Sequence, residues 1–116
     1  MPTVAFAAPI LPGKTGAFRE LARELTEGFR ADEMDVMQEK LGVHWEKWYV
    51  QETPDGTLAV IVFEADDPEV VMRELATSDD PSEVRMREKI REIHGIDLSD
   101  PEAAGPASEM VMDWTA

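Results

Sequence analysis

The chain has 116 residues, no cysteine, and a net charge of −14 from 25 acidic and 11 basic residues. Nucleic acids and anionic membranes are bound through clusters of Lys and Arg, so this charge balance argues against either as a partner. No run approaches the roughly 20 apolar residues of a membrane-spanning helix, and the length predicts a single domain over residues 1–116. The absence of cysteine excludes disulfides and thiolate chemistry, and it favours a cytoplasmic location.

The first predicted elements are a strand and a long helical region. Thr3 to Ile10 is apolar on both alternating sets of side chains, which predicts a strand that ends where prolines begin at Pro9-Ile-Leu-Pro-Gly13. From Lys14 apolar residues recur at helical spacing, with a predicted break near residues 28–33. The buried face of this region is predicted to carry Phe18, Leu21, Leu25, Phe29, Met34, Met37 and Leu41.

A hairpin is predicted next. Val43 to Thr53 and Leu58 to Ala65 are strand-like runs on either side of the turn sequence Pro54-Asp-Gly-Thr57. Within the second run, Leu58 to Phe63 has no polar residue on either face, so both faces are expected to be dry. Helices from a chain of this length can cover one face. We therefore expect a second copy to cover the other face in a homodimer.

Two helix-start signals and a final strand complete the pattern. An Asx residue followed by Pro at Asp66-Asp-Pro68 and at Ser78-Asp-Asp-Pro81 predicts a helical region split in two, which ends near His94 at Gly95. Residues 97–108 predict a loop, and Met110 to Trp114 a last strand. The order βαββαβ predicts an α+β, ferredoxin-like fold. Its four-stranded antiparallel sheet would have the first and third strands in the centre and all helices on one face.

Four segments carry a resemblance to known proteins: Phe6 to Lys14, Glu64 to Pro68, Ser78 to Pro81 and Glu92 to Leu98. They resemble segments of a small prokaryotic family of uncharacterised function. With the apolar sheet face, the chain also resembles the dimeric α/β barrel superfamily, in which two sheets pack face to face. The resemblance implies a dimeric α/β barrel. Because that superfamily includes cofactor-free monooxygenases, polyketide cyclases and haem-handling proteins, the resemblance selects no activity.

Proton-transfer chemistry has three candidate residues: His94, His44 and Tyr49. His94 borders the apolar stripe of the last helix near its C-terminus. There it is either a structural histidine bonded to a nearby carbonyl or carboxylate, or a general base at the edge of a cavity. His44 shares its alternating set with Glu46 and Trp48, but no His-x-His or His-Glu-x-x-His spacing exists. We therefore expect no metal site and no cofactor.

Ligand binding has four candidate residues: Trp45, Trp48, Tyr49 and His94. The aromatic residues either pack in the core or at the dimer interface, or they line a pocket for a flat apolar ligand. We expect such a pocket between the sheet and the helices. Two classes of function stay open. One is a dimer that binds a small apolar or aromatic molecule, and the other is a cofactor-free enzyme of monooxygenase or polyketide-cyclase type acting on an aromatic substrate.

Overall fold

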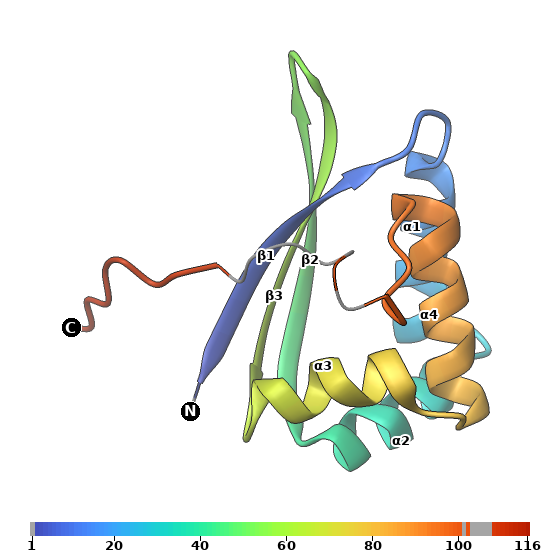
Figure 1. The fold of residues 1–116 in the computed structure, drawn as a ribbon, viewed down its shortest axis with the longest axis vertical. Coiled ribbons are helices and arrows are strands. Elements are labelled where there is room, and N and C mark those ends of the chain that lie inside the picture. Colours follow the sequence, from blue (N-terminus) through green and yellow to red (C-terminus); the bar gives the residue numbers. More distant parts are fainter. Residues whose placement is uncertain (1, 101, 103–107) are drawn as a thin grey trace.

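The computed structural model describes residues 2–100, 102 and 108–116. In chain order its helices and strands are β1 (Thr3–Ile10), α1 (Thr15–Thr26), α2 (Ala31–Leu41), β2 (Val43–Thr53), β3 (Gly56–Ala65), α3 (Pro68–Thr77) and α4 (Pro81–His94). The three strands form one antiparallel sheet in the order β1-β3-β2 (Figure 1). No helix in the described part of the chain is long and apolar enough to cross a membrane.

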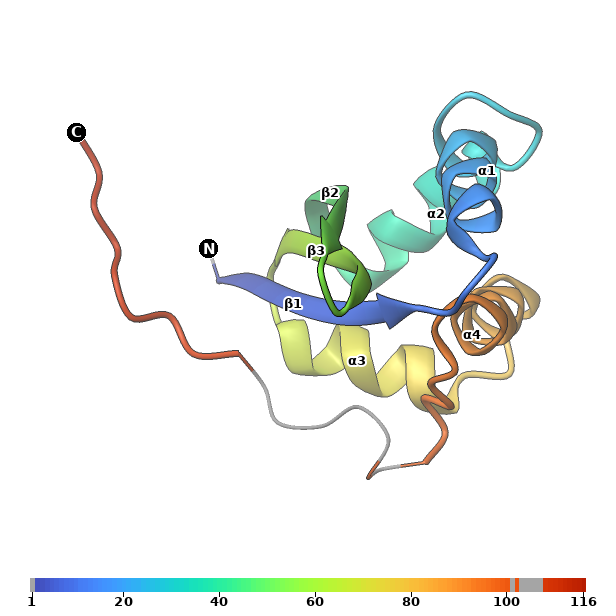
Figure 2. The same ribbon diagram turned by 90° about the horizontal axis from the view of Figure 1, so that it is seen from above.

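The central strand β3 has apolar side chains on both faces of the sheet, but only one of these faces is covered by helices. Ala59, Ile61, Phe63 and Ala65 point to one face and are buried, because all four helices pack there (Figures 1 and 2). Leu58, Val60 and Val62 alternate with them and point to the opposite face. The core beneath the helices contains Ile10, Phe18, Leu21, Leu25, Met37, Leu41, Ala59, Ile61, Phe63, Ala65, Val71, Met86 and Ile93.

The face of the sheet away from the helices, which we call the outer face, is mostly apolar along β1 and β3, whereas β2 adds Lys47 beside Val62 and Gln51 beside Leu58. Ala5 of β1 pairs with Val62 of β3, and Ala7 pairs with Val60, so small and branched apolar side chains lie side by side across it. Ala5 and Ala7 are exposed, and Val60 and Val62 are only partly buried. Within one chain only the helix-covered face of β3 is dry, so the prediction that both faces are dry is confirmed for that face alone.

The first helical region breaks where the sequence predicts. Phe18, Leu21 and Leu25 are buried by α1, which ends at Thr26. A Cβ on Gly28 would lie 2.8 Å from the Cα of Glu24, so only glycine lets the chain fold back this closely between α1 and α2. Phe29 follows in the connection and is 85% exposed. The prediction that Phe29 continues the buried face was wrong, because the helix has already ended.

The other helix ends follow their local signals. Asp67 caps α3 by accepting a hydrogen bond from the Glu69 N–H at 3.1 Å, and Asp80 caps α4 by accepting one from the Ser82 N–H at 3.0 Å. Proline stands in the first turn of both helices. Gly42 and Gly95, each with φ of 71°, end α2 and α4 in the left-handed conformation.

An ion pair between a partly exposed lysine and a buried carboxylate joins α2 to α4. The Glu83 side chain is 1% exposed, and its Oε1 accepts a hydrogen bond from Lys40 Nζ at 2.7 Å. Its Oε2 has no partner among the described residues. This pairing with Glu83 raises the pKa of Lys40. Because a buried carboxylate without a counter-ion is costly, the pair fixes how α2 and α4 pack together.

The predicted four-stranded ferredoxin-like sheet was wrong. Met110 to Trp114 is not a strand, and β1 is an edge strand beside β3 rather than a central one. Ser108 donates a hydrogen bond to the Ala5 carbonyl at the β1 edge, after which the chain runs away from the body (Figure 1). A strand forms only when its backbone pairs with another strand. The apolar pattern of residues 108–116, which we call the tail, does not specify which strand that would be. The predicted loop over residues 97–108 lies partly outside the described residues, at 101 and 103–107.

Asp67→Ala should lower the free energy of unfolding by about 1 kcal/mol, because the Glu69 N–H at the start of α3 loses its acceptor. Urea unfolding followed by circular dichroism measures this change. Asp67→Asn is the matched control, since its side-chain oxygen still accepts the bond and most of the stability should be retained. Equal losses in both variants would contradict the capping role.

Candidate functional site

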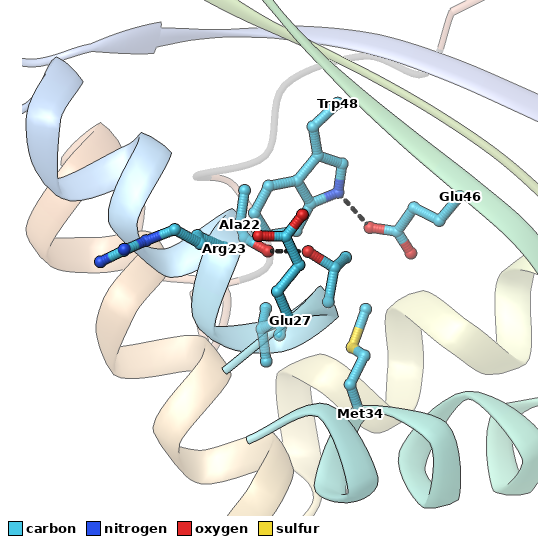
Figure 3. A pocket seen from close by; sticks show the side chains of 8 residues that line it. Ala22, Arg23, Glu27, Met34, Glu46 and Trp48 are labelled. Carbon is cyan, nitrogen blue, oxygen red and sulfur yellow. Dashed lines mark hydrogen bonds between the residues drawn. The ribbon is translucent and has the colours of Figure 1, made fainter. Parts of the chain in front are cut away.

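A groove opens between the end of α1, the start of α2 and the middle of β2. Its volume is about 280 Å³, enough for a small ligand rather than a drug-sized one. Figure 3 shows it with Trp48 as one wall and Met34 facing it from α2. The lining residues are Ala22, Arg23, Leu25, Thr26, Glu27, Met34, Glu46 and Trp48.

The groove exists because the first helical region is broken. Trp48 points to the helix-covered face of the sheet and stacks on Phe18 of α1, with ring centroids 5.2 Å apart and planes 18° apart. Beyond Thr26 there is no further turn of α1 to cover the indole, and α2 returns on the other side. Ala22 adds little bulk at the point where a larger residue would close the gap.

A carboxylate is fixed at the edge of this groove. Glu46 Oε1 accepts a hydrogen bond from Gln38 Nε2 of α2 at 2.9 Å. Its Oε2 accepts one from the indole N–H of Trp48, two residues along β2 (Figure 3). Two donors on different elements hold the Glu46 carboxylate in one position, so the groove combines an aromatic wall with an oriented anionic group.

His94 lies in the same layer but outside the groove. It is 8% exposed at the end of α4, and its Nδ1 is 2.8 Å from the Pro9 carbonyl oxygen. A carbonyl oxygen only accepts, so Nδ1 carries the proton. Burial lowers the pKa of His94, although the hydrogen bond to Pro9 acts in the opposite direction. Phe18 stands between His94 and Trp48, packing edge-on against His94 with centroids 5.6 Å apart.

Trp45 and Tyr49 are on the opposite side of the sheet from Trp48. Tyr49 pairs with Val60 on the outer face and is 54% exposed. Trp45 lies under the Lys47 ammonium, which is 5.1 Å from the ring centroid. Its indole N–H donates to Glu64 Oε2 at 3.1 Å. The sheet therefore divides the aromatic candidates: Trp48 faces the helices, and Trp45 and Tyr49 face outward.

His44 is held between two carboxylates at a bulge in β2. The strand register shifts between Val43 and Trp45, so His44 leaves the alternating set of Glu46 and Trp48 in which the sequence placed it. Its Nδ1 lies 3.1 Å from Glu64 and its Nε2 2.7 Å from Asp66. The hydrogen bond to Glu64, followed by that to Asp66, raises the pKa of His44. Both ring nitrogens are occupied, so His44 has no free lone pair with which to act as a base.

The structure brings one of the four predicted ligand-binding residues, Trp48, to the groove and leaves Trp45, Tyr49 and His94 elsewhere. Of the proton-transfer candidates His94, His44 and Tyr49, none lines the groove. Among the described residues, no group of three or more His, Asp or Glu is arranged to hold a metal ion. The residues that sequence reasoning missed as lining are Ala22, Arg23, Leu25, Thr26, Glu27, Met34 and Glu46. The predicted break between the helices was the only feature of the sequence that pointed to a groove at this place.

No protein-family model matches the chain, and no curated protein is similar to it in sequence at a significant level.

His44 should make the stability of the protein depend on pH. Its pKa is higher in the folded state than the ordinary value near 6.5. Its stabilising contribution is therefore complete below about pH 6.5 and is lost as the pH rises through the folded-state pKa. We expect wild type to exceed His44→Gln in free energy of unfolding most at pH 6 and least at pH 9.

Urea unfolding of both proteins across this pH range measures the difference. Burial lowers the pKa of His94, so its contribution has the opposite sign and falls as the pH drops below about 6.5. His94 is present in both proteins, so its contribution cancels when they are subtracted. A difference that stays constant with pH would show that the His44 bonds to Glu64 and Asp66 do not depend on its charge.

Proposed function

We propose that this protein binds a small apolar or aromatic molecule in the groove between α1, α2 and β2. The observation that carries the proposal is the position of Trp48. One face of its indole is fixed against Phe18, and the ring forms a wall of the groove together with Leu25 and Met34. Flat apolar surface beside a few oriented polar groups is the usual composition of a small-ligand site.

A second feature supports binding rather than simple surface irregularity. The polar atoms at the groove are organised before any ligand arrives, since Gln38 and Trp48 both donate to Glu46. Thr26 donates its hydroxyl hydrogen to the Ala22 carbonyl at 2.8 Å. Because these side chains are already held in place, binding a ligand here would cost the protein little conformational entropy.

Ala22→Leu tests the groove without removing a core side chain. The added atoms should occupy the space beside Trp48 and reduce the binding of small aromatic compounds by at least about tenfold, the loss expected when ligand and side chain compete for one space. Arg19→Leu is the control, because it adds an exposed leucine on the same helix outside the lining. Binding is measured from chemical-shift changes in an ¹⁵N-labelled sample. Equal binding by both variants would place the compounds elsewhere.

The enzymatic alternative is a cofactor-free monooxygenase or cyclase acting on an aromatic substrate. Such an enzyme needs a proton-transfer group within reach of its substrate. His94 is separated from the groove by Phe18, and both nitrogens of His44 are bonded. No observation therefore favours the enzyme over the binding protein.

We also propose that the protein is a homodimer formed through the outer face of the sheet. Ala5, Ala7, Val60 and Val62 form an apolar patch on this face, flanked by Lys47 of β2, and soluble monomers rarely expose a large continuous apolar surface. The tail extends to the same side of the molecule (Figure 1) and carries four exposed large apolar side chains, Met110, Val111, Met112 and Trp114. A second copy of the chain would cover both. We extend the proposal to a cytoplasmic location, which the absence of cysteine supports.

Val60→Glu should convert the dimer to a monomer, because it places a carboxylate between Ala7 and Tyr49 at the apolar centre of the outer face. The mass is measured by light scattering coupled to size exclusion at micromolar concentration. Arg19→Gln is the control, since it changes the net charge by the same amount on the helical side. A wild-type mass equal to the chain mass of 13.0 kDa would refute the dimer.

A further inference from the structure

We propose that the ligand of the groove is a small lipophilic cation: a protonated amine joined by a short chain to a single aromatic ring. This inference rests on the proposed function, because it specifies the ligand class of the same groove. It depends on where charge and aromatic surface lie around the groove.

The charges that face the groove are negative. Glu46 enters it from β2 and Glu27 from the end of α1, and Figure 3 shows both side chains directed inward beside Trp48. Arg23 is the one basic residue in the lining, and it points away (Figure 3). Its guanidinium pairs with Glu20 of the same helix. A cation entering the groove therefore meets two carboxylates without a competing positive charge.

Glu46 is suited to bind such a cation directly. Each of its oxygens accepts one hydrogen bond, from Gln38 and from Trp48, and a carboxylate oxygen can accept a second. The two donors are neutral, so they orient the carboxylate without neutralising it. An ammonium group that donates to Glu46 would form a charge-assisted hydrogen bond, which is stronger than a bond between neutral groups.

The rest of the groove accommodates the apolar part of the ligand. Trp48 offers its aromatic surface beside the carboxylate, and an indole attracts cations as well as flat rings. Leu25, Ala22 and the flexible side chain of Met34 complete an apolar surface that fits one ring better than two, given a volume of about 280 Å³. The net charge of −14 attracts cations and repels anions before they reach the site.

Three probes of nearly the same shape separate charge from shape: 2-phenylethylamine, 2-phenylethanol and 3-phenylpropionate. At pH 7 they are cationic, neutral and anionic. We expect the amine to bind at least about tenfold more tightly than the alcohol, and the anion to bind most weakly. Titration of ¹⁵N-labelled wild-type protein, with Trp48 indole and Ala22 amide signals as reporters, measures all three affinities.

Glu46→Gln should lower the affinity for the amine to near that for the alcohol and leave the affinity for the alcohol almost unchanged. Glu52→Gln is the matched control. It removes the same charge from the same strand, six residues away, or about 20 Å along an extended chain, and outside the lining. It should not alter the preference for the amine beyond a small long-range effect that 0.15 M salt suppresses.

The outcomes distinguish the inference from the function on which it depends. If the alcohol or the anion binds as tightly as the amine at the Trp48 reporters, the preference for a cation is refuted and the groove remains a ligand site. If none of the three probes shifts these reporters, both proposals are refuted for ligands of this size. If the amine binds but Glu52→Gln weakens it as much as Glu46→Gln, the attraction comes from net charge and the role of Glu46 is refuted.

Discussion

One-sided cover of the sheet is the constraint on which the rest of this structure depends. The apolar residues of β3 alternate between the faces, and every described helix packs against the face that contains Ile61 and Phe63. Burial on that face supplies the main stabilisation of the fold. It also leaves Val60 and Val62 on the outer face without helical cover. The fold of one chain thus generates both the proposed binding groove and the proposed interface, on opposite sides of the same strands.

The groove is a consequence of incomplete helical cover on the packed face. A continuous helix from α1 into α2 would have run past Trp48 and filled the space beside it. Gly28 instead lets the chain turn within contact distance of Glu24, and α2 begins on a different axis. The stacking of Trp48 on Phe18, and of Phe18 against His94, then forms a continuous aromatic row through the core. This row gives the groove a rigid wall and helps to bury His94, and that burial lowers the pKa of His94.

Much of the local structure could be predicted because its causes lie close together in the sequence. The caps Asp67 and Asp80, the left-handed glycines Gly42 and Gly95, and the turn that joins β2 to β3 each depend on a few adjacent residues. The last strand could not be predicted in this way. Met110 to Trp114 has strand-like composition, but pairing depends on a partner distant in the chain, and in the described structure the tail extends away from the β1 edge.

By itself, therefore, the sequence determined the first three strand runs, the helix breaks and the apolar side chains on both faces of β3, since periodicity and capping are short-range properties. Only the tertiary structure decided which residues share a site. Alternation shows that Trp48 and Trp45 point oppositely, but not which one meets the helices. The bulge at His44 turns its ring to Glu64 and Asp66, and Gln38 reaches Glu46 from another element. Such contacts arise from packing between elements, because no interval in the sequence encodes the distance between side chains on different elements.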